Sequence, residues 1–178
     1  MDAKTIVDFW MLAGPERQFA KDAAFDGALA VRFSGALRQA RLGSFDHWGE
    51  TPDGALALVI LLDQVSRNIH RGSPLAFAAD AKALILAKTF VGRGFHQMLP
   101  PPLAFWLIMP FEHAENLDAQ HRCVALFGTM GQHEMVYYAR MHLDIIARFG
   151  RFPHRNPVLG RRSTEAEIAF LQAGGFAG

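Results

Sequence analysis

Apolar residues recur at three- and four-residue intervals along most of the chain, a spacing typical of amphipathic helices and not of strands. We therefore predict an all-α fold of about eight helices. Because the intervening loops are short, helices that follow one another should pack as antiparallel neighbours. The pattern leaves open whether they form a bundle or a solenoid of helical hairpins. The predicted helices cover residues 3–13, 25–41, 52–70, 74–92, 103–116, 117–129, 133–149 and 164–174.

Several of these boundaries have local signals. Thr51-Pro52 and Ser73-Pro74 each place a capping hydroxyl before a proline at the first helical position, where the missing N–H costs nothing. Gly14 should end the first helix, since glycine readily adopts the left-handed conformation that follows a helix.

Later boundaries are marked in the same way. Pro110 should kink or split the helix that contains it, because proline removes a backbone donor. Thr164 with Glu167 three residues on forms a capping box for the last helix. No low-complexity linker interrupts the sequence, so we predict a single domain over residues 1–178.

Composition narrows the class of protein. The chain is 51% hydrophobic, and its net charge of +1 argues against a globally basic nucleic-acid-binding protein. Its one cysteine, Cys123, cannot form an internal disulfide, which fits a reducing cytoplasm. The apolar runs are too short or too interrupted for a signal peptide or a membrane span. We expect a cytoplasmic protein with no membrane partner.

Charge is distributed unevenly along the chain. Residues 1–144 hold 13 lysines and arginines against 15 acids, a balance of −2, whereas residues 145–178 hold 5 against 2, a balance of +3. The stretch Ile145–Thr164 contains no acid and is broken by two glycines and two prolines, so it should form a shaped loop. Arginine suits directional pairing with carboxylate or phosphate. We therefore expect this stretch to meet anionic groups, and not nucleic acid, with its five arginines Arg148, Arg151, Arg155, Arg161 and Arg162.

A second polar cluster lies within the predicted helix 52–70. Asp63 and Arg67 are four residues apart and continue the apolar stripe of that helix, with Gln64 and Asn68 beside them. One interpretation is an ordinary helical ion pair that contributes a few tenths of a kcal/mol. The other is a buried pair that forms part of a pocket wall, because a charge in line with core residues needs buried partners.

Further polar groups flank Pro110 and lie within helix 133–149. Glu112, His113 and Glu115 follow the proline, but a His-x-Glu spacing places its side chains on different helix faces and is a weak metal signal. A capping or core role for His113 is favoured. His142 lies on an apolar helix face, where a structural hydrogen bond is commoner than catalysis, although its near-neutral titration would suit an acid or base. We expect no metal and no cofactor.

Three segments together resemble a known family. They are Leu-Leu-Asp-Gln-x-x-Arg-Asn (61–68), Pro-Phe-x-His-x-Glu (110–115) and Arg-Phe-Gly-Arg-Phe-Pro-His-Arg-Asn-x-x-Leu-Gly-Arg-x-Ser-Thr (148–164). The chain resembles the bacterial "domain of unknown function 924" family over nearly its whole length. The resemblance implies a fold like that of tetratricopeptide-repeat proteins, with helical hairpins stacked in a right-handed arrangement. It implies no established activity.

The sequence departs from the family pattern at two places. Val65-Ser66 stands where the family usually has Phe-Pro or a similar pair, and Ala114 stands where it often has serine. A mechanism that uses a serine nucleophile at position 114 is therefore unavailable to this protein. No nucleophile–base pair can be read elsewhere in the sequence, which leaves open whether the protein is an enzyme.

Two functional hypotheses follow. The first is a polar, arginine-rich pocket that binds a small ligand bearing phosphate or carboxylate, with His113, His142 and Glu112 as the catalytic candidates. The alternative is a helical-repeat module that binds a peptide or protein, in which the arginines and acids form a structural ion-pair network. The predicted ligand-binding residues are Asp63, Gln64, Arg67, Asn68, Glu112, His113, Glu115, His142, Arg148, Arg151, His154, Arg155 and Asn156.

Overall fold

The computed structural model describes residues 1–177, which form helices and connecting loops without any β-strand, so the prediction of an all-α fold is confirmed. The shorter helical segments are the 3-10 helices η1 (Asp46–Glu50), η3 (Pro74–Phe77) and η4 (Pro153–Arg155) and the π-helical η2 (Leu61–Val65). The α-helices are α1 (Ala3–Gln18), α2 (Ala23–Arg41), α3 (Pro52–Ile60), α4 (Ser66–Ile69), α5 (Asp80–Gly92), α6 (Phe95–Met98), α7 (Pro101–Glu112), α8 (Leu117–Thr129), α9 (His133–Phe149) and α10 (Glu165–Gln172).

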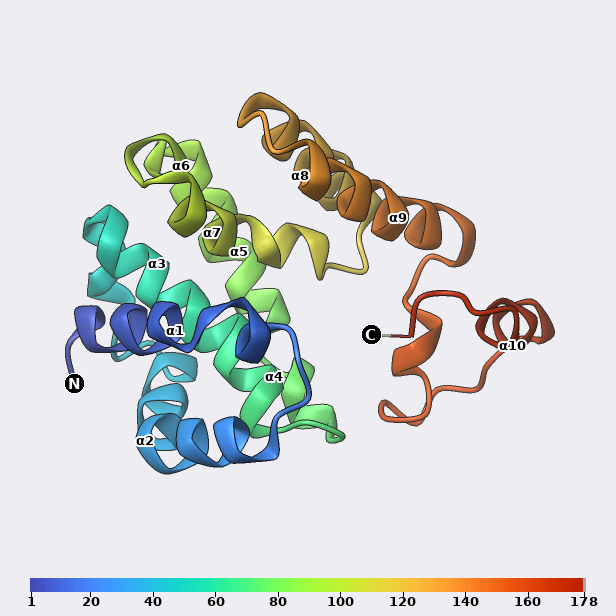
Figure 1. The fold of residues 1–178 in the computed structure, drawn as a ribbon, viewed down its shortest axis with the longest axis horizontal. Helices are drawn as coiled ribbons and strands as arrows, with labels where there is room; N and C mark the ends of the chain where they lie inside the picture. Colours follow the sequence, from blue (N-terminus) through green and yellow to red (C-terminus); the bar gives the residue numbers. More distant parts are fainter. Residues whose placement is uncertain (178) are drawn as a thin grey trace. The chain divides into compact units, whose positions relative to one another are not determined.

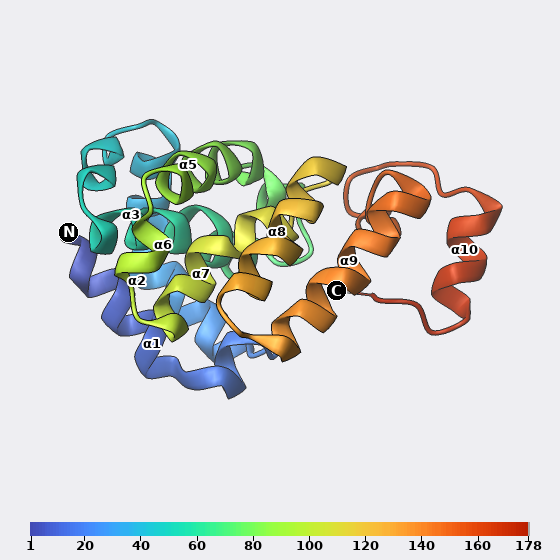
Figure 2. The ribbon, with the colours of Figure 1, turned by 90° about the horizontal axis from the view of Figure 1, so that it is seen from above.

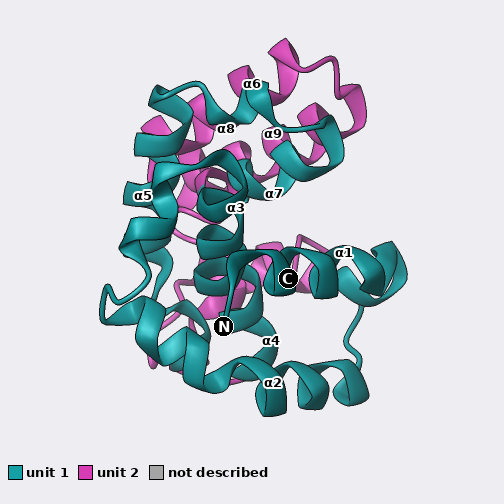
Figure 3. Ribbon diagram, turned by 90° about the vertical axis from the view of Figure 1, so that its left-hand side faces the viewer, with its two compact units in different colours: residues 1–71, 75–110 teal, residues 72–74, 111–178 magenta. Residues whose placement is uncertain are grey.

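The chain divides into two compact units, coloured separately in Figure 3. Unit 1 contains residues 1–71 and 75–110, and unit 2 contains residues 72–74 and 111–178. The division falls within α7, next to Pro110. The single domain over residues 1–178 stays a prediction, as does the tetratricopeptide-repeat-like, right-handed arrangement of hairpins.

Unit 1 is built around α3. Every residue from Gly54 to Ile60 is buried, which is expected of a helix that is apolar on all sides. Helices α1 and α5 pack against α3, while α2 packs against η2 and α4 (Figure 1). An edge-on contact between Trp10 and Trp106, with ring centroids 5.1 Å apart, adds to this core.

The predicted start and stop signals of unit 1 have mixed outcomes. The Thr51 hydroxyl accepts a hydrogen bond from the Gly54 N–H and Pro52 begins α3, as predicted. The predicted break at Gly14 is also present, since Gly14 has a φ of 72° and interrupts α1. A continuous helix over 74–92 is wrong, because Pro74 begins only a 3-10 turn that ends at Phe77, and α5 begins at Asp80.

Unit 2 contains a helical hairpin followed by a long loop. Helices α8 and α9 lie side by side and antiparallel (Figure 2). Gly150, with a φ of 71°, ends α9 in the left-handed conformation. The loop from Arg151 to Ser163 contains η4 and leads into α10, whose predicted capping box between Thr164 and Glu167 is confirmed. Among the described residues, no helix is both long and apolar enough to cross a membrane.

The close packing at the start of α3 predicts that a side chain at Gly54 would destabilise the fold. A Cβ atom added to Gly54 would overlap the carbonyl oxygen of Trp48, which is backbone and cannot move aside cheaply. We expect Gly54→Ala to lower the free energy of unfolding by about 1–3 kcal/mol, as other overpacked sites do. Urea unfolding measures this change.

The matched control is Gly35→Ala within α2, where an added Cβ meets nothing within 4 Å. That substitution should raise the free energy of unfolding by about 0.4–1 kcal/mol, because it reduces the entropy of the unfolded chain. Equal effects of the two substitutions would contradict the packing seen at Gly54.

Candidate functional site

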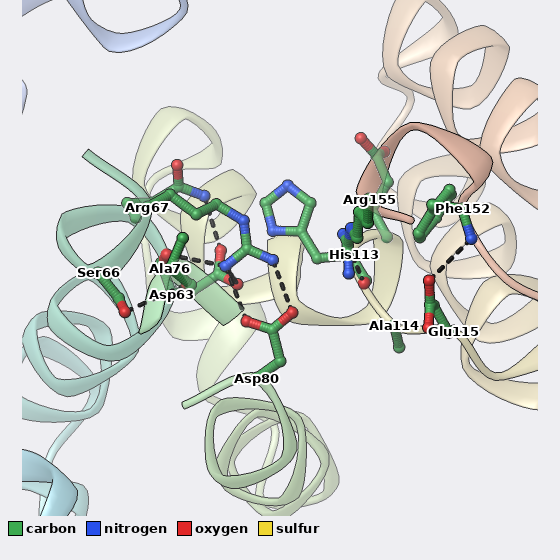
Figure 4. Close-up of polar contacts among 12 residues, drawn as sticks. Asp63, Ser66, Arg67, Ala76, Asp80, His113, Ala114, Glu115, Phe152 and Arg155 are labelled. Atoms are coloured by element: carbon green, nitrogen blue, oxygen red, sulfur yellow. Dashed lines mark hydrogen bonds and ion pairs between the residues drawn. The ribbon is translucent and has the colours of Figure 1, made fainter. Parts of the chain in front are cut away.

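The polar cluster of unit 1 is centred on Arg67. Its guanidinium donates to Asp63 Oδ1 at 2.9 Å and to both carboxylate oxygens of Asp80, at 2.9 and 3.0 Å (Figure 4). The amide of Gln64 donates to the other oxygen of Asp63 at 2.7 Å. Burial alone would lower the pKa of Arg67, but the charges of Asp63 and Asp80 outweigh it and raise the pKa. Arg67 is therefore a permanent cation bound by two carboxylates.

Asp63 and Gln64 are buried within a π-helical turn. η2 continues α3 through Leu61–Val65 with the wider π-helical spacing, and Asp63 is only 1% exposed and Gln64 only 7%. The ion pair expected from the i, i+4 spacing of Asp63 and Arg67 is present. Asn68 is directed elsewhere, since its amide donates to Asp26 of α2 at 2.7 Å.

In unit 2, two arginines of the loop are paired with carboxylates. Arg151 donates to both oxygens of Glu167, at 2.6 and 2.9 Å, and to the carbonyl of Arg162 at 2.9 Å. Arg161 donates to both oxygens of Glu115, at 2.6 and 2.8 Å. Bidentate pairs of this kind are among the strongest charge-assisted hydrogen bonds in proteins. These two cations are thus neutralised by the protein's own acids.

A buried asparagine joins the two pairs. Asn156 is fully buried, its side-chain oxygen accepts from Arg161 Nε at 2.9 Å, and its amide donates to Glu167 Oε2 at 3.3 Å. Glu115 also accepts the Phe152 N–H at 2.8 Å, which ties the loop backbone to the same set (Figure 4). We call the five connected side chains the loop network: Glu115, Arg161, Asn156, Glu167 and Arg151.

Both acids of the loop network have lowered pKa values. The hydrogen bonds from Arg151 are the main cause for Glu167, where they outweigh burial and lower the pKa to about 2. Burial would raise the pKa of Glu115, but hydrogen bonds from Arg161 and the Phe152 N–H outweigh it and lower the pKa. Both groups are therefore carboxylates at neutral pH.

A second cluster in unit 2 contains the buried histidines. His142 Nδ1 lies 2.9 Å from the Tyr138 carbonyl, which fixes the hydrogen on Nδ1, and 3.7 Å from Glu112 Oε1. Burial lowers the pKa of His142, so the ring is neutral at neutral pH. Burial, together with the charge of Arg155, lowers the pKa of His154 to about 4. A structural role for His142 fits this geometry.

The remaining polar candidates of this cluster are held by nearby groups. The guanidinium of Arg155 donates to the His113 carbonyl at 3.0 Å (Figure 4) and stacks on Phe152, 4.5 Å from the ring centroid. Cys123 is fully buried, and burial together with the negative charge of Glu112 raises its pKa, so the thiol is unreactive. Among residues 1–177, no three His, Cys, Asp or Glu side chains gather where they could hold a metal ion.

Arg148 is the predicted binding residue with the most open surroundings. It is exposed at the end of α9, and its guanidinium lies over the rings of Phe149 and Phe170, at 4.7 and 5.7 Å from their centroids. Within the described part of the chain it pairs with no carboxylate. It lines a surface depression of about 450 Å³, which we call the Arg148 depression, together with Phe149, Arg151, Thr164, Ala166 and Glu167.

The predicted site residues are thus distributed over both units. Asp63, Gln64, Arg67 and Asn68 belong to unit 1, and the other nine belong to unit 2. The predicted ligand-binding set omitted three partners, Asp80, Arg161 and Glu167, although Arg161 was expected to meet an anionic group. A count of charges could have identified Glu167 as a candidate partner, because residues 145–178 contain five arginines and only two acids that could pair with them.

Comparisons with known proteins agree with this description of the chain. The family described as "Bacterial protein of unknown function (DUF924)" matches residues 6–175. The chain belongs to this family. The resemblance inferred from the sequence is therefore confirmed.

A solved structure of another protein of unknown function, ATU0120 from Agrobacterium tumefaciens, is similar with a TM-score of 0.92. Its sequence is 41% identical to this chain, and the similarity covers 97% of each. The comparison with curated proteins found no match. For this member of the family, functional inference therefore depends on the residues themselves.

The lowered pKa of Glu167 predicts how the free energy of unfolding depends on pH in acid. A carboxylate whose pKa is lower in the folded protein stabilises the fold above its ordinary value of 4.5, and this stabilisation is lost as the pH falls towards 2. We expect wild type to be more stable than Glu167→Gln at pH 7, and this difference to shrink between about pH 4.5 and 2. Urea unfolding over a pH series measures it.

Glu165→Gln is the control, because Glu165 is exposed in the same helical turn and forms no ion pair within residues 1–177. Its acid dependence should follow that of wild type. A constant difference between wild type and Glu167→Gln at all pH values would show that the carboxylate charge does not stabilise the loop.

Proposed function

We propose that the protein binds a small anionic ligand, bearing carboxylate or phosphate, in the Arg148 depression of unit 2. The supporting observation is that Arg148 lines this depression and forms no ion pair with a carboxylate of residues 1–177. Two half-buried arginines of the loop that follows α9 are paired with carboxylates, Arg151 with Glu167 and Arg161 with Glu115. An anion from solution would complete the same pattern at Arg148.

The local charge favours an anion. Arg148 and Arg151 contribute two positive charges to the depression and Glu167 contributes one negative charge, which leaves an excess of one positive charge. Arg151 is already held by Glu167, so it shapes the depression, and the excess positive charge is that of Arg148. The guanidinium carbon of Arg148 lies over the rings of Phe149 and Phe170, and its N–H groups form no ion pair with a carboxylate of residues 1–177, so they can bind a ligand.

This proposal changes the role expected of individual arginines. Arg151 and Arg155 are directed toward groups of the protein itself, whereas Arg148 is directed toward a depression. The binding roles predicted for the residues of unit 1 and for the histidines are not needed by this proposal and stay predictions. So does a catalytic role for Glu112, His113 or His142.

A second candidate function is supported by the loop network. If the arginines serve only to hold the loop, the protein is a helical module that binds a peptide or protein, as the alternative hypothesis from the sequence holds. The pairing of Arg151 and Arg161 with acids favours a structural role for those two residues. The two functions differ in what they predict for Arg148.

The test is anion binding to wild type and Arg148→Gln, with inorganic phosphate and acetate as probes. Amide chemical shifts, titrated at constant ionic strength, report the affinity and the location of binding. A hydrogen bond to a charged group contributes about 1.5–3 kcal/mol, so Arg148→Gln should weaken binding by about ten-fold or more. Its exposed position means that the variant should fold normally.

Arg122→Gln is the matched control, since Arg122 is an exposed arginine of α8 in the same unit that lines no depression described above. It should bind both anions as wild type does. Equal affinities for wild type and Arg148→Gln would reject the proposed site and favour the interaction module.

A further inference from the structure

A groove adjoins the Arg148 depression in unit 2. It has a volume of about 420 Å³ and runs along the exposed side of α9 to α10 and the residues that follow it. Arg148 and Phe149 line both the groove and the Arg148 depression, so the two spaces meet at these residues. We call it the α9 groove, and its other lining residues are Tyr137, Arg140, Met141, Asp144, Ile145, Phe170, Gly174, Gly175 and Phe176.

We propose that the ligand of Arg148 is a small amphipathic monoanion, a carboxylate attached to an aromatic or aliphatic body that lies in the α9 groove. This inference rests on the proposed anion site and adds the chemical class of the ligand. Its carboxylate would pair with Arg148, and its apolar body would extend from there along α9 toward Tyr137.

The lining of the groove suits an apolar body. Six of its residues have aromatic or apolar aliphatic side chains, and Tyr137 is 68% exposed. Covering such surface with an apolar group removes it from water, which is favourable in proportion to the area covered. Gly174 and Gly175 have no side chains that would fill the groove from its other side. These features together favour a ligand with an apolar part over a bare inorganic anion.

The charged residues that line the groove favour a ligand with a single negative charge. Arg140, Asp144 and Arg148 follow one another at four-residue intervals along α9, so they lie along one side of the helix. The carboxylate of Asp144 would repel a negative charge beside it, while Arg140 and Arg148 on either side would attract one. Arg148 differs from Arg140 in that it also lines the Arg148 depression. Arg140, Asp144 and Arg148 together give the groove a net charge of +1. A phosphate dianion would exceed this net charge, whereas a carboxylate matches it and suits the planar fork of arginine.

The backbone of the groove argues against a peptide bound as an added strand, and its volume suits a small molecule. A peptide that is bound as an added strand forms main-chain hydrogen bonds to an open edge. Here the walls are helices, and the N–H groups of Gly174 and Gly175 already donate to the carbonyls of Leu171 and Phe170. The volume of the groove also lies within the range of about 300–1,000 Å³ that is usual for small-ligand sites.

The experiment compares three probes on the full chain. They are acetate, 4-phenylbutanoate and the uncharged 4-phenylbutanamide, and amide chemical-shift titrations measure their affinities. We expect 4-phenylbutanoate to bind at least about ten-fold more tightly than either of the other two, because only it uses both Arg148 and the groove.

Substitutions then separate the two parts of the site. Tyr137→Ala should weaken 4-phenylbutanoate binding by about five-fold or more and leave acetate unchanged. Tyr138→Ala is the matched control, since the centroids of the two tyrosine rings are 5.5 Å apart but only Tyr137 lines the groove. It should bind both probes as wild type does. Met141→Asp, which places a negative charge within the groove, should abolish the preference for 4-phenylbutanoate.

The outcomes distinguish failure of this inference from failure of the proposed function. If acetate binding depends on Arg148 but 4-phenylbutanoate binds no more tightly, the anion site stands and the apolar part of the ligand is rejected. If 4-phenylbutanamide binds as tightly as the carboxylate and Arg148→Gln changes neither, the amphipathic anion and the anion site are both rejected. Unequal affinities of wild type and Tyr138→Ala would also reject the groove as the place of binding.

Discussion

The arrangement of unit 2 depends on the pairing of loop arginines with acids that are distant in the sequence. Glu115, which precedes α8, binds the guanidinium of Arg161 and the backbone N–H of Phe152. Glu167 of α10 binds Arg151, and Asn156 connects the two pairs. The loop has four arginines and no acid of its own, so like charges within it would otherwise repel one another. The loop network thus lets a strongly basic segment pack against its neighbours.

This constraint also gives Arg148 its different position. The acids of the loop network are paired with Arg151 and Arg161, and Arg148 forms no ion pair with any carboxylate of residues 1–177. Arg148 instead lies on aromatic rings at the meeting point of a polar depression and an apolar groove. The same network that stabilises the loop therefore produces the surface on which we place a ligand. The pairing of arginines with acids therefore determines both the stability of the loop and the position of the proposed binding site.

The sequence predicts features that depend on neighbouring residues and misses those that depend on distant ones. The capping box of Thr164 and Glu167 could be predicted because both members lie within one helical turn. The bond of Arg67 to Asp80 and that of Arg161 to Glu115 could not, since the partners are 13 and 46 residues apart and only the fold brings them together. The π-helical turn at Leu61–Val65 was also missed, because the spacing of apolar residues there suits an ordinary helix equally well.

The loop network is tested most directly by a double-mutant cycle on Glu115 and Arg161. The free energies of unfolding of wild type, Glu115→Gln, Arg161→Gln and the double variant would be measured in urea at pH 7. The cycle cancels effects that each residue has alone, including the hydrogen bond of Glu115 to Phe152. A bidentate, half-buried pair predicts a favourable coupling energy of about 1–3 kcal/mol. A coupling energy below about 0.3 kcal/mol would show that the two residues act independently and would contradict the loop network.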